Sequence, residues 1–127
     1  MEPIQITLRG RPITKKNSSQ IIKTGGKRKV IPSKQFSAYE EACLYQLIKA
    51  PQTREENLNM QCLYYMPTRH RVDLVNLLQA TCDILVKAGI IEDDSSKVIA
   101  GHDGSRVLYD KENPRVEITL SEVSNES

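Results

Sequence analysis

Two groups of carboxylates in the chain have the residue types and the setting that a hydrolytic metal site needs. Asp73 follows the basic segment 68–72 and begins a stretch of helical periodicity, and the acidic run 92–94 follows the end of that stretch. Hard cations such as Mg²⁺ prefer oxygen ligands, usually one or two carboxylates completed by water and phosphate oxygens. Beside Lys and Arg side chains, such a cation could activate water and stabilise the charge developing on a phosphodiester. The pattern is therefore typical of a site that cuts nucleic acid.

Simpler explanations exist for the same residues. Asp73 could serve only as a helix N-cap, a role worth about 1 kcal/mol, and the run 92–94 could be a solvated turn. Asp83 and Lys87 are four residues apart in the helical stretch, which predicts an exposed ion pair. His70 and His102 are isolated and not at zinc-ligand spacing, so we expect surface histidines. Asp103 precedes Gly104 and is expected in a turn.

Basic residues are concentrated at one end of the sequence. The net charge is only +2, but residues 1–35 carry nine Lys or Arg against a single Glu. A polarised charge distribution of this kind favours a polyanionic partner. Part of it lies on a predicted hairpin whose two strands flank Gly25-Gly26, since glycine accepts the positive φ of a tight turn.

Length and composition set outer limits on the kind of protein. A chain of 127 residues and 14.4 kDa can form one domain, expected over residues 1–121 with a frayed tail at 122–127. No apolar run approaches the roughly 20 residues that span a bilayer, and the first residues lack the apolar core of a signal peptide. We therefore expect a cytoplasmic protein without membrane association, with its three cysteines reduced and mostly buried.

Hydrophobic periodicity predicts an α+β fold, a small mixed, mostly antiparallel sheet with two main helices packed on it. One helix should begin after Ser33 or Ser37 and end near Ala50, with Ile48 on its buried stripe. The second should begin at Asp73 and end at Ala88, with Gly89 as the C-terminal residue that stops it. Strands are expected at 4–8, 20–24, 27–31, 58–66, 97–100, 106–109 and 115–120.

The second helix separates the two carboxylate groups. Its 15 residues, 74–88, span about 22 Å, so Asp73 and Asp94 lie near opposite ends unless the chain folds back. Residues 89–94 reach about 20 Å when fully extended, barely enough for a return within one subunit. A helix that begins later, or a site shared between two subunits, would also bring the groups together.

One family shows these features in the same order along the chain. The segments are Met66-Pro67, the basic stretch ending at Arg71-Val72, Asp73-Leu74-Val75-Asn76-Leu77, Asp83, Lys87-Ala88-Gly89-Ile90 and Asp93-Asp94. The chain thereby resembles the RusA-type endodeoxyribonucleases, strongly over about residues 66–98 and more loosely from Arg11-Pro12 to the last strand. The resemblance implies a small, often prophage-associated homodimer that acts in DNA recombination and repair. Such a protein binds four-way (Holliday) junctions and nicks two strands symmetrically with Mg²⁺ or Mn²⁺.

The resemblance also implies which residues form the site. Asp73 and Asn76 match the first aspartate and the asparagine of the family motif, and Asp93-Asp94 match its later acidic pair. The implied catalytic residues are Asp73, Asn76, Asp93 and Asp94; of these, Asp73 and Asp94 hold the cation and Asp93 assists. The residues expected to contact DNA phosphates are Lys15, Lys16, Arg69 and Arg71.

Two positions depart from the family motif. Val75 stands where a second aspartate is expected, and Gln79 stands where a lysine is expected. Valine cannot ligate a cation and glutamine carries no charge. Replacements could come from a carboxylate among Glu92, Asp93 and Asp103 and from a cation among Lys15, Lys16 and Arg71. The alternatives are a catalytically weakened or inactive junction-binding protein and, in a third class, a small adaptor that binds protein.

Overall fold

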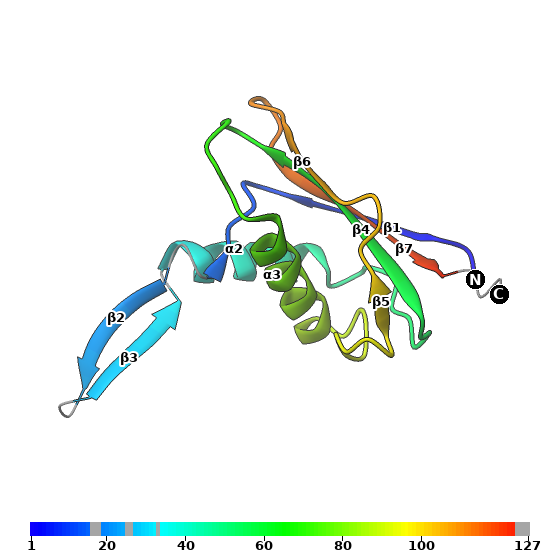
Figure 1. Ribbon diagram of the computed structural model, residues 1–127, viewed down its shortest axis with the longest axis horizontal. Coiled ribbons are helices and arrows are strands. Elements are labelled where there is room, and N and C mark those ends of the chain that lie inside the picture. The colour runs from blue at the N-terminus through cyan, green and yellow to red at the C-terminus, as the bar shows by residue number, and fades with distance from the viewer. Residues whose placement is uncertain (16–18, 25–26, 33, 124–127) are drawn as a thin grey trace.

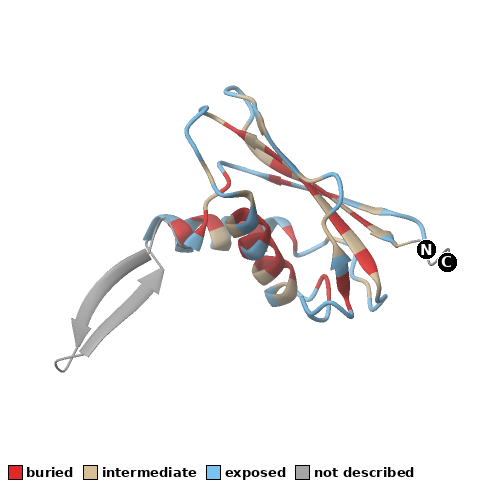
Figure 2. Cartoon of the chain, viewed as in Figure 1, coloured by how far each residue is buried: buried red, intermediate tan, exposed pale blue. Residues whose placement is uncertain are grey.

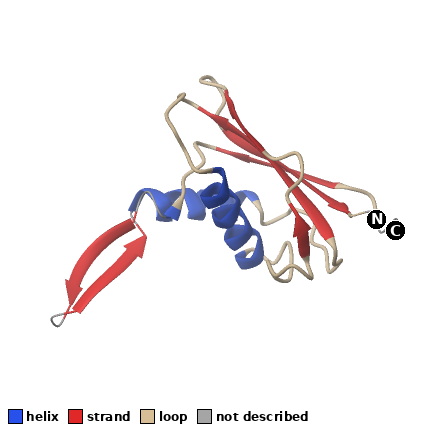
Figure 3. Cartoon of the chain, in the orientation of Figure 1, coloured by secondary structure: helices blue, strands red, loops and turns tan. Residues whose placement is uncertain are grey.

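The structure is a computed structural model that describes residues 1–15, 19–24, 27–32 and 34–123. Within these residues a five-stranded sheet carries two helices, and a separate two-stranded ribbon lies away from it (Figure 1). Both helices lie on the same side of the five-stranded sheet (Figure 3). The expected α+β fold, with a mixed and mostly antiparallel sheet, is confirmed.

Strand β4 (Leu58–Met66) is the centre of the sheet. It pairs antiparallel with β7 (Arg115–Glu122), which pairs antiparallel with β1 (Ile4–Arg9). On its other edge, β4 pairs in parallel with two short strands, β5 (Ile99–Gly101) and β6 (Arg106–Tyr109). The bounds of β4 and β6 agree with the prediction, whereas β5 begins two residues later than expected and β7 continues two residues further.

The predicted basic hairpin is present as a pair of strands. Strand β2 (Ser19–Thr24) pairs antiparallel with β3 (Lys27–Pro32), with Thr24 opposite Lys27. Gly25 and Gly26, the predicted turn of the hairpin, lie outside the described residues. Figure 1 shows the ribbon standing apart from the sheet, at the end of the molecule opposite the chain termini.

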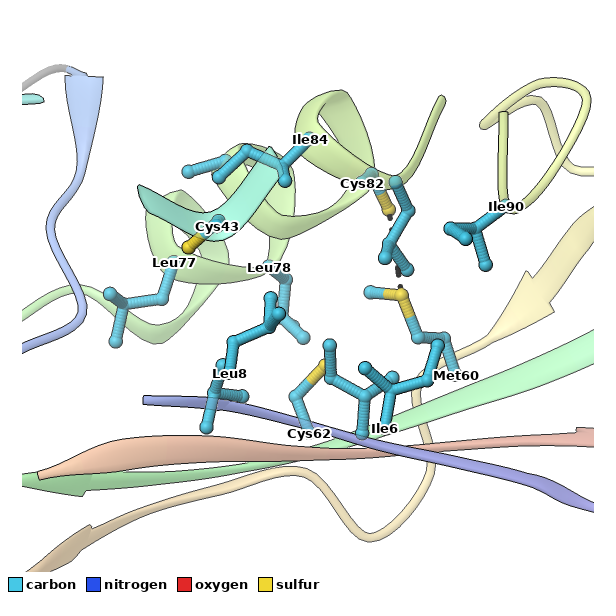
Figure 4. Close-up of a cluster of buried hydrophobic side chains, with 14 of the residues drawn as sticks. Ile6, Leu8, Cys43, Met60, Cys62, Leu77, Leu78, Cys82, Ile84 and Ile90 are labelled. Atoms are coloured by element: carbon cyan, nitrogen blue, oxygen red, sulfur yellow. Dashed lines mark hydrogen bonds between the residues drawn. The ribbon is translucent and has the colours of Figure 1, made fainter. Parts of the chain in front are cut away.

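Strict alternation in β4 creates the face on which the helices pack. Every second residue of β4 is buried, and the same face of β7 and β1 contributes further apolar side chains (Figure 2). Helices α2 (Lys34–Gln46) and α3 (Leu74–Lys87) cover this face. Figure 4 shows Ile6, Leu8 and Cys62 on the sheet side of the cluster and Leu78 and Cys82 on the α3 side. Burial of this face is the main stabilising contribution to the fold.

Helix α2 ends four residues earlier than predicted, at Gln46 rather than near Ala50. Past this point the backbone tightens: Ala50 N–H donates to Leu47 O at 3.1 Å, three residues back, just ahead of Pro51. A residue that precedes proline is disfavoured in helical conformation. The change of winding turns Ile48 out of the core, so its predicted burial is wrong and its side chain is 70% exposed.

Helix α3 begins and ends where the sequence predicts. Asp73 is its N-cap and Ala88 its C-cap, and Gly89 follows with φ of +76°. Its rotation on the sheet is fixed by a buried polar contact: Tyr64 Oη lies 2.7 Å from Thr81 Oγ1, which donates to Leu77 O at 2.9 Å. With the Thr81 face held against β4, the opposite face of α3 is presented to solvent.

The three cysteines are free and buried, as expected. Burial raises the pKa of Cys43 to about 11 and the pKa values of Cys62 and Cys82 to about 12. At pH 8 each thiolate fraction is then on the order of 0.1% or less. We expect a disulfide reagent such as DTNB to leave all three thiols of the native protein unmodified over minutes. In denaturant it should titrate three thiols per chain. A rapidly reacting thiol in the native protein would show that one of these pockets opens.

Candidate active site

The outward face of α3 carries a polar stripe. Asp73, Asn76, Gln79 and Asp83 follow one another at spacings of three, three and four residues, which places their side chains on one side of a helix. The opposite face contains the buried residues of α3, so the stripe is fixed toward solvent by the same packing that forms the core. We refer to these four residues as the α3 stripe.

Gln79 joins two carboxylates that are distant in sequence. Its Nε2 donates to Asp83 Oδ1 at 3.0 Å and to Asp94 Oδ2 at 3.1 Å. The two carboxylate oxygens therefore lie no further apart than the sum of these distances. Behind them, the charges of Asp94 and then Asp83 add to the burial that raises the pKa of Cys82. Asp83 and Asp94 thus form a compact carboxylate pair on the middle of α3.

The chain folds back to place Asp94 there. After Gly89, the N–H of Ile90 donates to Leu85 O at 2.9 Å, which turns the chain against the end of the helix it has just left. Ile90 and Ile91 are then buried, at 0% and 2% exposure. The return thus occurs within one subunit, and the two hydrophobic side chains hold it in place.

Lys15 lies beside the carboxylate pair. Its Nζ is 3.3 Å from Asp83 Oδ2 and 5.6 Å from the centre of the Phe36 ring. Together with Asn76, Gln79 and Asp83, it lines a small pocket of about 80 Å³. Lys15, which is expected from the sequence to contact DNA phosphates, therefore lies at this pocket. Lys16 lies outside the described residues.

The predicted ion pair between Asp83 and Lys87 is wrong. Lys87 Nζ instead lies 2.8 Å from Glu40 Oε1 of α2, a carboxylate whose side chain is only 18% exposed. Packing of the two helices supplies Lys87 with a more shielded partner than Asp83. Asp83 contacts Lys15 and Gln79 instead. Helical spacing alone therefore predicted the wrong partner for a residue of the candidate site.

Asp73 lies at the other end of the α3 stripe. Its Oδ1 accepts hydrogen bonds from the backbone N–H groups of Val75, at 2.9 Å, and Asn76, at 3.3 Å. It precedes Gln79 by six residues, which corresponds to about 9 Å along the axis. The N-cap role is thus confirmed, and the carboxylate pair lies between one and two turns away. Val75 is 71% exposed, so a longer polar side chain would meet no steric obstacle there.

The other acidic residues considered as replacements have local partners. The pKa of Asp93 is lowered by hydrogen bonds within its own turn, to the Asp94 backbone and to Ser95. Glu92 Oε1 lies 3.5 Å from Arg54 Nε. Asp103 exchanges backbone hydrogen bonds with the side chain of Asn59, in the turn between β5 and β6. Asp83 is the carboxylate that the structure places next to Asp94.

Two of the expected DNA-contacting residues lie in the loop between β4 and α3. The guanidinium group of Arg69 stacks on the Tyr109 ring, 4.2 Å from its centre. Arg71 lines a pocket of about 270 Å³ together with Val72, the residue before Asp73. Both arginines are exposed.

The donor set suits a particular kind of metal site. The described residues contain no group of three or more His, Cys, Asp or Glu side chains that could enclose a metal ion. They do contain the carboxylate pair, and Mg²⁺ in phosphate-processing sites commonly takes one or two carboxylates with water and phosphate oxygens as its other ligands. The residues therefore fit a hard cation that water and substrate complete.

Comparison with known proteins agrees with this arrangement. Residues 9–121 match the model of the protein family described as Endodeoxyribonuclease RusA. No curated protein matches the chain. Across the described part of the chain, no helix has the length and apolar character to cross a membrane. The family match covers nearly the whole sequence, including both carboxylate groups and the α3 stripe. The chain therefore belongs to the RusA family of endodeoxyribonucleases.

Proposed function

We propose that this protein is a metal-dependent endonuclease that resolves four-way DNA junctions by paired phosphodiester hydrolysis. The observation that carries the proposal is the convergence of Asp83 and Asp94 on Gln79, beside Lys15, in a chain of a DNA endonuclease family. A compact pair of carboxylates next to an ammonium group is suited to holding a cation and a phosphate together.

The proposed cation is Mg²⁺ or Mn²⁺. Asp94 would hold it, with Asp83 as the adjacent carboxylate and Asp93 assisting from the preceding position in the chain, and Asp73 would contribute from the beginning of α3, about 9 Å along the axis from Gln79. When bound, such an ion lowers the pKa of water and neutralises charge on the phosphate. The Oδ1 atom of Asp73 accepts both capping hydrogen bonds, so its Oδ2 is the oxygen that would serve the cation.

The remaining residues of the site orient the carboxylates and neutralise negative charge. Gln79 is uncharged, and its amide holds the Asp83 and Asp94 carboxylates next to each other by hydrogen bonds. Lys15 supplies the positive charge that glutamine cannot, because its ammonium group lies at the same carboxylate pair. Asn76 lines the same small pocket, where its amide can donate to a phosphate oxygen or orient water. Arg69, Arg71 and Lys16 would hold the DNA backbone.

The proposed assembly is a homodimer. A four-way junction presents two equivalent strands for cutting, and a two-fold symmetric pair of subunits would offer two equivalent sites. Because the Asp83–Asp94 pair forms within one subunit, each protomer would bring a complete pair. The dimer then serves to space two cuts rather than to complete one site.

The proposal is tested by incubating purified protein with an end-labelled four-way junction, with and without Mn²⁺, and resolving the strands on a denaturing gel. We expect nicks at symmetric positions in two opposing strands only when Mn²⁺ is present, and none in a linear duplex of the same sequence. A protein that binds the junction but never nicks it, at any metal concentration, would instead be the inactive binding protein that Val75 and Gln79 make conceivable.

Substitution of Asp73 separates its structural role from a catalytic one. Asparagine is as good an N-cap as aspartate, whereas alanine removes the cap at a cost of about 1 kcal/mol. We expect Asp73→Asn to keep the thermal unfolding midpoint and junction binding of the wild type and to lose nicking. Asp73→Ala should lose both nicking and stability. If Asp73→Asn cuts at the wild-type rate, Asp73 is a cap alone.

A further inference from the structure

A second concave site lies outside the α3 stripe. It is a pocket of about 270 Å³ between the loop after β1, the loop after β4 and the beginning of α2. Arg11 comes from the first loop, His70 and Arg71 come from the second, and Gln35 comes from the first turn of α2. Three chain segments that are far apart in sequence therefore converge on it.

The pocket is electrostatically one-sided. Its described lining residues include two arginines and a histidine but no carboxylate, and Thr14 and Thr68 add hydroxyl groups. Among the described residues, Arg54 and Arg115 have ion-pair partners within 4 Å. Within this part of the chain Arg11 and Arg71 have none, and the same is true of Arg9, Arg69 and Arg106. Two guanidinium groups on one small pocket repel each other, and an anion between them would remove that repulsion.

The beginning of α2 adds to the positive potential. Gln35 is the second residue of this 13-residue helix, so the pocket lies at the end of the helix where unpaired backbone N–H groups and the helix dipole favour negative charge. Guanidinium groups, hydroxyl groups and a helix N-terminus together are the donors that a phosphate group requires.

The pocket is adjacent in sequence to the beginning of the α3 stripe. One of its lining residues, Val72, immediately precedes Asp73. From there to Gln79, where the carboxylate pair lies, the distance along the helix is about 9 Å. A DNA strand advances about 3.4 Å per nucleotide along its duplex axis, so this separation corresponds to about two to three nucleotides.

We propose that this pocket binds one backbone phosphate of the DNA strand that is cut, about two to three nucleotides from the scissile bond. Arg11 and Arg71 grip the phosphate oxygens from opposite loops, and the first turn of α2 faces them. The pocket thereby fixes the register of the strand on the carboxylate pair. This inference deepens the proposed nuclease function and rests on it for the location of the cut.

The experiment measures junction binding in EDTA, by fluorescence anisotropy, so that it does not depend on cleavage. Each phosphate near the junction point is replaced in turn by a neutral methylphosphonate. We expect one position per strand at which this replacement weakens binding to the wild type. For the double variant Arg11→Gln/Arg71→Gln, replacement at that position should have no further effect, while the other positions keep theirs.

Salt dependence provides a second measurement. Loss of one phosphate contact reduces the magnitude of the slope of log K against log salt by about 0.9, and we expect this change for the double variant Arg11→Gln/Arg71→Gln. Lys49→Gln removes the same charge from an exposed position beyond the other end of α2 and should leave the slope unchanged. Arg71→Lys keeps the charge and should keep most of the slope.

The possible outcomes test the phosphate-binding pocket separately from the nuclease activity. If the double variant keeps the wild-type slope and the wild-type methylphosphonate pattern, the pocket does not bind a phosphate, whether or not the protein cuts. If the variants behave as expected in a protein that never nicks, the phosphate site stands and the nuclease proposal fails. Unchanged unfolding midpoints of the variants confirm that these exposed substitutions report on binding.

Discussion

Asp94→Asn is expected to lower the rate of junction nicking by at least about a hundredfold while leaving junction binding in EDTA unchanged. The substitution preserves the size of the side chain and an oxygen that can accept a hydrogen bond from Gln79 Nε2. In the wild type this nitrogen lies 3.1 Å from Asp94 Oδ2. It removes the negative charge that would attract the cation. Loss of one electrostatic contact to the transition state commonly costs 10²- to 10³-fold in rate, and the rate of strand cleavage under single-turnover conditions measures it.

The matched control for Asp94→Asn is Glu112→Gln. Glu112 is exposed in the turn before β7, so its replacement changes the net charge equally without touching the α3 stripe. We expect this control to cut at the wild-type rate. Nicking by Asp94→Asn at more than about a third of the control rate would remove Asp94 from the catalytic site and leave its contact with Gln79 as a structural one.

Lys15→Ala is expected to lower nicking about ten- to a hundredfold, and the added substitution Gln79→Lys is expected to restore most of the loss. Lys15 Nζ lies 3.3 Å from Asp83 Oδ2, and Gln79 contacts the same carboxylate. An ammonium group placed at position 79 would therefore occupy nearly the same electrostatic position. Because the Lys15 side chain is 46% exposed, its charge is worth less than a contact in a water-excluded site, and single-turnover rates of the two variants and the wild type measure the effect.

This pair of substitutions separates catalysis from general DNA attraction. Lys111→Ala removes an exposed lysine far along the chain from the stripe and should change the rate little at moderate salt. Failure of Gln79→Lys to rescue, together with a Lys15→Ala defect that disappears at saturating DNA, would show that Lys15 only attracts DNA. A Lys15→Ala rate equal to the wild-type rate would place the necessary charge elsewhere.

The parts of the fold that the sequence predicted well are those whose signals are local. The apolar alternation of residues 58–66 and the positions of Asp73 and Gly89 specify β4 and α3, because a strand period and a helix cap act over a few neighbouring residues. The end of α2 was missed for a different reason. Pro51 stops a helix, but how many turns tighten before it depends on how the chain then joins the core.

The candidate site depends on contacts that no local pattern contains. Asp94 reaches Gln79 because Ile90 and Ile91 are buried after Gly89, and chain length alone allowed this return without requiring it. Asp83 was misassigned because a partner four residues away was available, while its actual partner, Lys15, comes from 68 residues earlier in the chain. Tertiary contacts therefore decided which of the acidic and basic residues meet.

The most direct test of the account is the binding of Mn²⁺ to the DNA-free protein, measured by the loss of the free-ion signal in electron paramagnetic resonance. We predict that the wild type and Glu112→Gln bind one ion per chain. Asp94→Asn combined with Asp83→Asn should keep its fold, checked by circular dichroism, and bind none. Equal Mn²⁺ binding by the double variant and the wild type, or no binding by the wild type at millimolar Mn²⁺, would contradict a cation held at this carboxylate pair.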